Sequence, residues 1–469
     1  MAEANKVVAN NKSVKWSPKP TDPIKQRSKN SFDKLIGEAM FGFIALILFV
    51  ILIFLNVPIS VSMGIASAIC LMLMDIPMVA LPQKMVAGVQ SWVLLSIPFY
   101  VLAAQIMNHG GIAERLFNFA DELVGWLKGG LAHANIMASM IFAGISGAAV
   151  ADASGLGLVE IEAMDKAGYD RKFAVGVTAA SCMLGPIIPP SIMLIIYGHL
   201  AELSIASLWF AGIIPGVLTG IILMAYVYWA VATGKENAPP AHPFSIRNTG
   251  KSFIQNFFVV LLPIILLGAI VTGLATPTET GIIACIYTFI LALVARGRAF
   301  IRDLPLVVIG TVKASGVIMF IIATATIFVW IMTTERTAIL ISEGLLNLTQ
   351  NKYLALLIIN IFLLLIGALL EQIPAMLIVV PLLAPMAVQL AINPIQFGII
   401  VVFNLMIGMI TPPMGMALYI MAAISGVPMK DVIGASMRFF FALVFALLLI
   451  TYIPFLSTFI PGLLGMSLN

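Results

Sequence analysis

SCMLGPIIPPS at residues 181–191 is the stretch that decides the fold, because it has a counterpart, NLMIGMITPPM, at residues 404–414. In both strings a polar residue, a glycine and a pair of prolines stand at the same spacing. A further glycine, Gly144, recurs as Gly367 at the same offset along the chain. The other Pro-Pro pair, at 239–240, lies in a polar loop and lacks this glycine. The five matched positions indicate an internal duplication.

The repeated Gly-x3-Pro-Pro pattern predicts a broken membrane helix in each half. Proline cannot donate a backbone N–H, and its ring clashes with the carbonyl one turn earlier. Two prolines after a glycine therefore free several backbone carbonyls, which hydrocarbon tolerates only where protein, water or a bound cation satisfies them. Paired broken helices in repeated halves point to the midplane site of a secondary transporter. The alternative is a simple kink, but a kink needs only one proline.

The composition is that of a polytopic membrane protein. Of 469 residues, 61% are hydrophobic and 10% are charged, and the mean hydropathy is +1.08. Soluble domains carry about 25% charged residues, so most side chains here must face lipid or one another. Apolar stretches long enough to cross about 30 Å of hydrocarbon recur along the chain. We therefore predict an all-α polytopic membrane protein with two inverted repeats, each containing a re-entrant helical hairpin and a broken transmembrane helix.

The remaining composition argues against other classes of function. The three cysteines lie in apolar runs and the four histidines are scattered, so we expect neither a disulfide framework nor a metal-ligand cluster. The net charge of +4 is dominated by the N-terminal tail, and topology explains basic residues beside a membrane better than nucleic-acid binding does. TGKS at 249–252 resembles the end of a phosphate-binding loop, but Ser245 stands where that motif needs glycine. We expect no nucleotide, no ATP coupling and no organic cofactor.

The chain divides into alternating scaffold and transport segments. Residues 1–36 are polar and basic, which predicts a cytoplasmic tail, and the basic loops 233–251 and 296–302 are expected on the same side. Residues 113–128 have the apolar and charged faces of an interfacial amphipathic helix. The predicted segments are the tail (1–36), scaffold spans with the amphipathic helix (37–130), a first hairpin and broken helix (131–204), scaffold spans (205–304), scaffold or arm helices (305–351), a second hairpin and broken helix (352–423) and a C-terminal span (424–469).

A segment that reads as a re-entrant hairpin precedes each broken helix, at 146–170 in the first half and at 367–387 in the second. Each holds an acidic residue near its start, Asp152 in the first and Glu371 in the second. A carboxylate within the membrane is costly and is a candidate functional group. The alternatives are helix capping for Asp152 and a structural hydrogen bond for Glu371.

Other polar residues of these segments complete the predicted site. Glu160, Glu162 and Asp165 are expected near the aqueous end of the first hairpin, away from the substrate. The predicted substrate-binding residues are Asp152, Ser154, Ser181, Ser191, Glu371 and Asn404.

Several strings resemble the large membrane subunit of tripartite ATP-independent periplasmic (TRAP) transporters. They are SGAAVAD, AMDKAGYDRKFAVGVTAAS and GPIIPPSIMLIIYG in the first half and NPIQFGIIVVFNLMIGMITPPMGMALYI in the second. The resemblance implies a sodium-driven elevator transporter of the ion-transporter superfamily, in a bacterial inner membrane and in contact with its lipid. It also implies a small four-span membrane subunit and a periplasmic binding protein as partners. The cargoes implied are C4-dicarboxylates, sialic acids, keto acids or sulfonates, with Na⁺ as the coupling ion.

The resemblance further implies where sodium binds, at the hairpin tips and the broken helices. The implied positions are Ser146, Gly185, Pro186 and Pro190 in the first half and Gly367, Gly408, Thr411 and Pro413 in the second. Because 1–36 contains no span, we expect the small subunit to be a separate chain.

Three other functions compete with this interpretation. A stand-alone sodium-coupled organic-anion carrier would share the hairpins and breaks but would need no binding protein. An intramembrane enzyme requires a nucleophile with a base or a metal, which the scattered histidines do not supply. A non-catalytic assembly scaffold would leave the acidic hairpins and the matched breaks unexplained. We therefore expect a transporter and not an enzyme.

Overall fold

The computed structural model describes residues 39–466 apart from 338–339, 342–343, 345–348 and 350. Within that part the secondary structure is helical throughout, without a strand. Seven of the described helices are long and apolar enough to span a membrane, or eight if the bent pair Ala80–Val89 and Val93–His109 counts as one span. The prediction of an all-α polytopic membrane protein is confirmed. The predicted tail 1–36 lies outside the described residues.

The chain folds as two groups of scaffold helices, two groups of short central helices and a C-terminal pair. The N-terminal scaffold helices are α2 (Met40–Phe54), α3 (Ile59–Leu73), α4 (Ala80–Val89), η1 (Val93–Leu95), α5 (Ser96–His109) and α6 (Ile112–Val124). The first central group is α7 (Gly130–Ser146), α8 (Ala149–Ala151), η2 (Asp152–Leu156), α9 (Gly157–Lys166), α10 (Arg171–Ser181), η3 (Cys182–Leu184) and α11 (Ile192–Leu200).

The second half begins with longer helices. The middle scaffold helices are α12 (Ile205–Ala232), α13 (Ile246–Val271), α14 (Pro277–Arg296) and α15 (Arg298–Thr334). The second central group is α17 (Lys352–Leu369), α18 (Gln372–Gln389), α19 (Pro394–Gly408) and α20 (Met416–Ser425), and the C-terminal pair is α21 (Met429–Tyr452) and α22 (Phe455–Leu463).

Each central group consists of a hairpin followed by a broken helix. Hairpin 1 comprises α7, α8, η2 and α9, and break 1, residues 185–191, separates η3 from α11. Hairpin 2 comprises α17 and α18, and break 2, residues 409–415, separates α19 from α20. Each break holds its Pro-Pro pair, and both Pro-Pro peptide bonds are cis.

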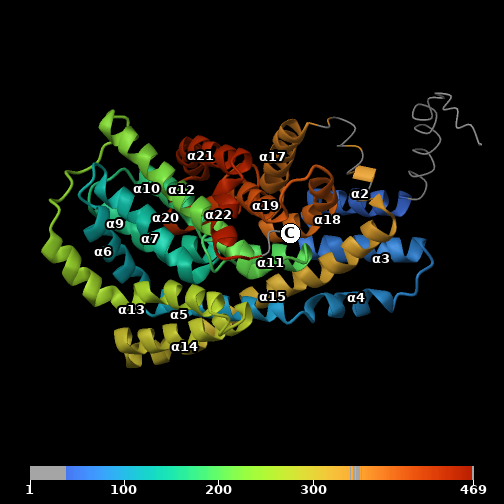
Figure 1. The fold of residues 1–469 in the computed structure, drawn as a ribbon, viewed down its shortest axis with the longest axis horizontal. Helices are drawn as coiled ribbons and strands as arrows, with labels where there is room; N and C mark the ends of the chain where they lie inside the picture. The colour runs from blue at the N-terminus through green and yellow to red at the C-terminus, as the bar shows by residue number, and fades with distance from the viewer. Residues whose placement is uncertain (1–38, 338–339, 342–343, 345–348, 350, 467–469) are drawn as a thin grey trace, which may run out of the picture.

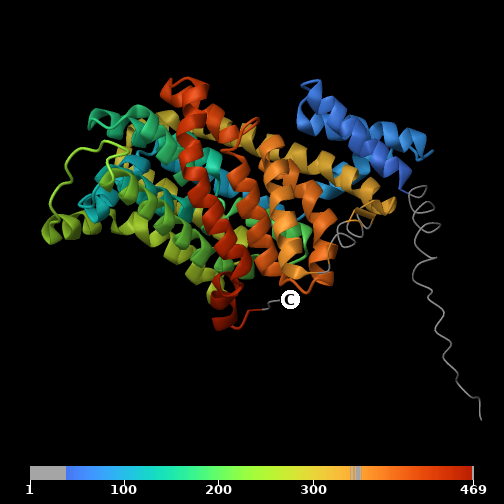
Figure 2. The same ribbon diagram turned by 90° about the horizontal axis from the view of Figure 1, so that it is seen from above.

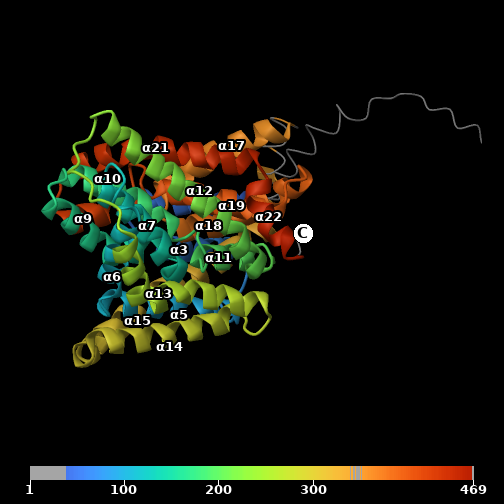
Figure 3. The ribbon, with the colours of Figure 1, turned by 60° about the vertical axis from the view of Figure 1, so that its left-hand side comes forward.

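The broken helices form the centre of the molecule. A helix that is apolar all round must be buried on every side, and α19 is buried at every position from Ile395 to Gly408. α19 packs against α17, α18 and α21, and α11 packs against both α18 and α19, so the two central groups share one core. Figures 1 and 3 show α18 and α19 between a layer containing α17 and α21 and an opposite layer containing α5, α13, α14 and α15.

The long helix α15 links the scaffold to the central groups. It contacts α2, α3, α4 and α5 on the scaffold side and α18 of hairpin 2. Figure 2 shows α2 and α3, in blue, at one end of the molecule beyond the gold α15. α13 and α14 are consecutive helices that pack against each other, so the basic loops that precede α13 and follow α14 lie at the same end.

The amphipathic helix predicted at 113–128 corresponds to α6, and protein covers most of its apolar face. Leu116, Phe117 and Phe119 are buried, because α6 packs against α7 and α13. The amphipathic pattern therefore indicates a helix that packs beside hairpin 1. The expectation that its apolar face lies in the membrane interface is corrected.

Candidate functional site

Break 1 is held directly against the tip of hairpin 1. The backbone N–H of Ile192, at the start of α11, donates to the carbonyl of Gly147 at 3.2 Å. Gly147 has a φ of +63°, and a Cβ there would collide with the carbonyl of Pro190. Only glycine fits this close approach. Ser191 donates to the carbonyl of Pro186 and accepts from the N–H of Leu194, so it caps α11 and braces the break.

A buried carboxylate lies beside this contact. The side chain of Asp152 is 1% exposed; its Oδ1 accepts a hydrogen bond from the hydroxyl of Ser146, and its Oδ2 has no partner. A Cβ placed on Gly185 would collide with that Oδ2. Asp152, Ser146 and Gly185 form what we call the oxygen cluster. No backbone N–H of the described chain donates to the carboxylate of Asp152, so its side chain is not a helix cap.

The oxygen cluster has the chemistry of a cation site. A buried carboxylate oxygen without a donor is strongly destabilising unless a cation or a proton compensates it. Carboxylate, hydroxyl and freed backbone carbonyl oxygens are the ligands through which broken helices bind sodium. Gly185 keeps space free at the unpartnered oxygen, because any side chain there would fill it.

Break 2 repeats the arrangement with a different exposure. A Cβ on Gly408 would collide with the backbone of Gly367, and the N–H of Met414 donates to the carbonyl of Ala368 at 3.1 Å. Hairpin 2 thus meets its break as hairpin 1 does. Whereas Pro189 and Pro190 are buried, Pro412 and Pro413 are exposed, and Pro413 borders an apolar groove of about 660 Å³ between α2 and hairpin 2.

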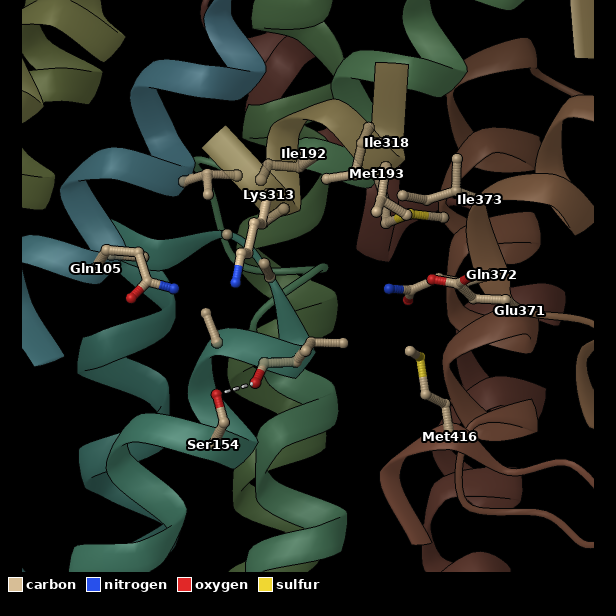
Figure 4. A pocket seen from close by; sticks show the side chains of 18 residues that line it. Gln105, Ser154, Ile192, Met193, Lys313, Ile318, Glu371, Gln372, Ile373 and Met416 are labelled. Carbon is tan, nitrogen blue, oxygen red and sulfur yellow. Dashed lines mark hydrogen bonds between the residues drawn. The ribbon is translucent and has the colours of Figure 1, made fainter. Parts of the chain in front are cut away.

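The two hairpin tips face each other across a central cavity of about 380 Å³ (Figure 4). Hairpin 1 and α11 line one side, hairpin 2 and Met416 line another, and α5 and α15 close it from the scaffold. Most of the lining is apolar. Its polar side chains are Gln105, Ser154, Lys313, Glu371 and Gln372.

The family of the chain follows from comparison with known proteins. The model of the family described as "Tripartite ATP-independent periplasmic transporter, DctM component" matches residues 46–456. The chain belongs to this family. It is therefore a TRAP large permease, a multi-pass membrane transporter and not an enzyme.

The most similar relatives carry different substrates in their names. The chain is 39% identical to the sialic acid TRAP transporter permease SiaT of Haemophilus influenzae, over 90% of this chain and 68% of that protein. It is 38% identical to the sialic acid TRAP transporter large permease SiaM of Vibrio cholerae, over 81% of this chain and 89% of that one. The C4-dicarboxylate TRAP transporter large permease DctM of Pseudomonas aeruginosa is 37% identical, over 87% and 95% respectively.

A solved structure has the same fold. The YdaH transporter of Alcanivorax borkumensis, whose crystal structure was described as having an unusual topology, matches with a TM-score of 0.56 at 15% identity. The match covers 78% of this chain and 86% of that one. At this identity the likeness supports the fold of the TRAP permease and not its substrate.

The structure places the predicted substrate residues of the TRAP permease in four different environments. Ser154 and Glu371 line the central cavity, where the Ser154 hydroxyl donates to the carbonyl of Val150 at 2.7 Å. Asp152 lies in the oxygen cluster, and Ser191 lies in break 1. The carboxylate of Glu371 has no hydrogen bond and no ion pair within the described chain, so it is not used structurally there.

Ser181 and Asn404 lie outside the cavity lining, in equivalent buried hydrogen bonds. Ser181 donates to Asn135 of α7 at 2.7 Å, and Asn404 donates to Asn360 of α17 at 2.8 Å. Each pair joins a broken helix to the first helix of the preceding hairpin. The repeat in the sequence thus marks a pair of interhelical contacts at these two positions.

Glu160 is not at the aqueous end of hairpin 1, so this expectation was wrong. Its side chain is 1% exposed and accepts a hydrogen bond from Ser139 of α7 at 3.4 Å. Within the same hairpin, Glu162 is exposed and forms an ion pair with Lys166 at 3.3 Å, and Asp165 forms one with Arg171. α9 turns Glu160 toward α7 and Glu162 away from it, which periodicity in this polar segment does not reveal.

Lys313 and two glutamines of the cavity were missed by the sequence analysis. Lys313 is the one charged residue between Asp303 and Glu335, a stretch that α15 covers almost entirely. A lysine within a membrane helix costs roughly 2.5–3.5 kcal/mol on insertion scales and is a functional candidate by default. That signal was present in the sequence, whereas nothing in it marked Gln105 or Gln372.

A second, more polar pocket of about 570 Å³ lies beside the central cavity. It is formed by the α5–α6 turn, by Gly155 and Val159 of hairpin 1 and by the end of α14, with Arg115 and Arg296 in its lining. Asn108, one turn beyond Gln105 on α5, donates to the carbonyl of Ala151 at 3.4 Å. This contact separates the two pockets along the interface between α5 and hairpin 1.

Proposed function

We propose that this chain imports a small organic anion, a carboxylate or a sulfonate, together with sodium. The observation that carries the proposal is the central cavity, which the tips of both hairpins line while α5 and α15 close it from the scaffold. Its volume of about 380 Å³ lies within the usual range for small-molecule sites. A TRAP permease with such a cavity has a place for one small substrate beside its two breaks.

The names of the relatives support an anionic cargo. They include permeases for sialic acid and for C4-dicarboxylates. A further relative is the isethionate TRAP transporter permease of Oleidesulfovibrio alaskensis, which is 32% identical over 90% of this chain. These compounds differ in size and share a carboxylate or sulfonate group. Lys313 places one positive charge among the mostly apolar walls of the cavity, which suits a carboxylate or sulfonate.

Sodium is proposed as the coupling ion because the oxygen cluster offers an unpartnered buried carboxylate oxygen next to break 1. Each sodium that moves inward gains about 2.3 kcal/mol per 100 mV of membrane potential. Two or more sodium ions per cycle would offset the charge of an organic anion and still drive its accumulation. The positions proposed for sodium remain those at the hairpin tips and breaks of both repeats.

An elevator motion fits the way in which the cavity is built. The hairpins and breaks pack against one another, and α5 and α15 of the scaffold pack against the hairpins through α7 and α18. The apolar groove between α2 and hairpin 2 marks a loose contact between these two parts. We propose that the hairpins and breaks move as a unit past α5 and α15, exposing the cargo on alternate sides.

The family is named for a tripartite, ATP-independent transporter, and we propose a small four-span membrane subunit and a periplasmic binding protein as the partners of this chain. The binding protein would capture the substrate with high affinity, and the small subunit would enlarge the scaffold and hold it upright in the bilayer. The membrane site can then be weak.

Omission of single components tests this assignment. In proteoliposomes with an inward sodium gradient, concentrative uptake is expected only when this chain, the small subunit, the loaded binding protein and the substrate are all present. Omission of either partner should reduce uptake to the level of protein-free vesicles. The substrate is chosen by thermal-shift screening of the cognate binding protein against organic acids. Robust uptake by the purified chain alone would overturn the tripartite assignment and favour a stand-alone carrier.

A further inference from the structure

We propose that Lys313 of α15 binds the anionic group of the cargo from the scaffold side of the central cavity. This inference rests on the proposed function, because it assumes that the central cavity is the substrate cavity. It adds a residue that lies in neither hairpin and neither break, and it assigns the negatively charged end of the substrate to a fixed position on the scaffold.

The placement of Lys313 along α15 excludes the usual reason for a lysine in a membrane helix. Long cationic side chains near helix ends reach the lipid headgroups. Lys313 lies ten residues after Asp303, the nearest charged residue before it on α15, which is about 15 Å along a helix. A lysine side chain cannot span that distance.

The ammonium group of Lys313 has no acceptor among its described neighbours in the protein. In Figure 4 its ammonium group points into the cavity, between Gln105 on one side and Gln372 on the other. Lys313 has no hydrogen bond and no ion pair with any described residue. Lys313 is exposed to the cavity, and an ammonium group carries three donors and no acceptor, so it is suited to a ligand that supplies oxygen atoms and negative charge.

Gln372 gives a second, independent sign of an absent ligand. Its side chain is 5% exposed, and its Oε1 is buried without a hydrogen-bond partner. Buried amide oxygens are nearly always satisfied in folded proteins. A substrate whose carboxylate or sulfonate meets Lys313 and which carries a hydroxyl or amide donor would satisfy both groups. Relatives named for sialic acid transport handle a substrate of this kind.

The location of Lys313 on α15 gives it a role that a hairpin residue cannot have. The residues of the hairpins would travel with the cargo, whereas Lys313 stays with the scaffold. Lys313 can therefore contact the anion only while the hairpins hold the position that they have in this structure. Lys313 would stabilise the loaded cavity in this one position and lose the anion when the hairpins move.

Protection of an engineered cysteine tests the proposal on the full-length purified chain. Val317 lines the cavity one helical turn from Lys313 and is 59% exposed, so a Val317→Cys variant reports on the cavity. The native cysteines Cys70, Cys182 and Cys285 are buried. The rate of N-ethylmaleimide labelling is measured in sodium against increasing sialic acid, succinate or isethionate, and against uncharged succinamide as the control for charge.

The measurement is made in four backgrounds: Lys313, Lys313→Arg, Lys313→Gln and Lys84→Gln. Lys84 is a matched control, because it is a scaffold lysine of α4 that stacks on Trp330 of α15 and does not line the cavity. At least one of the anions should slow labelling with Lys313, with Arg at 313 and with Lys84→Gln. In Lys313→Gln the protecting concentration should rise by about tenfold to a hundredfold, as expected for a lost hydrogen bond to a charged group.

The outcomes distinguish the role of Lys313 from the role of the cavity as the substrate site. Protection that is equal in the Lys313 and Lys313→Gln backgrounds would overturn the role of Lys313 while keeping the cavity as the substrate site. Labelling that no anion slows, even with Lys313 present, would overturn the cavity itself and this inference with it. Protection by succinamide as effective as that by succinate would also contradict an ionic contact. Sodium-dependent thermal stabilisation of each variant shows that the oxygen cluster is folded.

Discussion

Replacement of Asp152 by Asn is expected to shift sodium-dependent uptake to much higher sodium concentrations. The substitution keeps the shape of the side chain and its contact with Ser146 but removes the negative charge of the unpartnered oxygen beside Gly185. Contacts to charged groups contribute about 1.5–3 kcal/mol, so the apparent affinity for sodium should decrease by about tenfold to a hundredfold. The measurement is uptake by the complete transporter against sodium concentration, at equal amounts of reconstituted protein.

Glu162→Gln is the matched control for Asp152→Asn. It removes a carboxylate from the same hairpin, but Glu162 is exposed and pairs only with Lys166, and such surface pairs contribute little. Its uptake should equal that of the parent. Glu160→Gln is expected to act differently from both, through the packing of α9 on α7, because Glu160 is buried and bonded to Ser139. A sodium dependence of Asp152→Asn that matches the parent would remove Asp152 from the cation site.

Replacement of either repeated Pro-Pro pair by Ala-Ala is expected to abolish uptake while the protein still folds. Alanine restores a backbone donor and a high helix propensity, so the helix can extend through the break. The carbonyls proposed to bind sodium would then accept helical hydrogen bonds instead. The expected result is normal expression, loss of sodium-dependent thermal stabilisation and uptake at background. The changes at 189–190 and at 412–413 should behave alike, because each break meets the tip of its own hairpin.

Pro239 and Pro240 offer the control for this experiment. They form the other Pro-Pro pair, in the loop between α12 and α13, and their replacement by Ala-Ala removes as many prolines without touching a break. Uptake and sodium-dependent stabilisation should stay at the parental level. If the variants at 189–190 and 412–413 also kept their sodium dependence, the breaks would be structural kinks and not cation sites.

The fold could be predicted from the sequence because its decisive feature is local. A glycine and two prolines at matched positions break a helix, and their repetition located both breaks. The hairpins expected at 146–170 and 367–387 correspond to the tip and second arm of each hairpin, whose first arms are α7 and α17. The burial of Asp152 could be anticipated in the same way, since a carboxylate in an apolar hairpin needs a partner. These inferences depend on neighbours in the chain or on a repeat that the chain itself displays.

The parts that failed depend on contacts between distant segments. Glu160 and Glu162 are two residues apart, and only the packing of α9 on α7 decides which of them is buried. The apolar face of α6 suited either lipid or protein, and α7 and α13 cover it. Gln105 and Gln372 come from α5 and α18, and both line the cavity only because hairpin 2 packs against the scaffold. Lys313 was visible as a lone charge, but its direction was not.

The central claim, sodium-coupled import of an organic anion, is tested most directly by ion replacement in the complete transporter. Proteoliposomes holding this chain and its small subunit, with loaded binding protein outside, are given either an inward sodium gradient or an equal potassium gradient at the same imposed membrane potential. Concentrative uptake is expected with sodium, increasing as the interior becomes more negative, and none above protein-free vesicles is expected with potassium. Uptake that continues unchanged when potassium replaces all sodium would contradict the account.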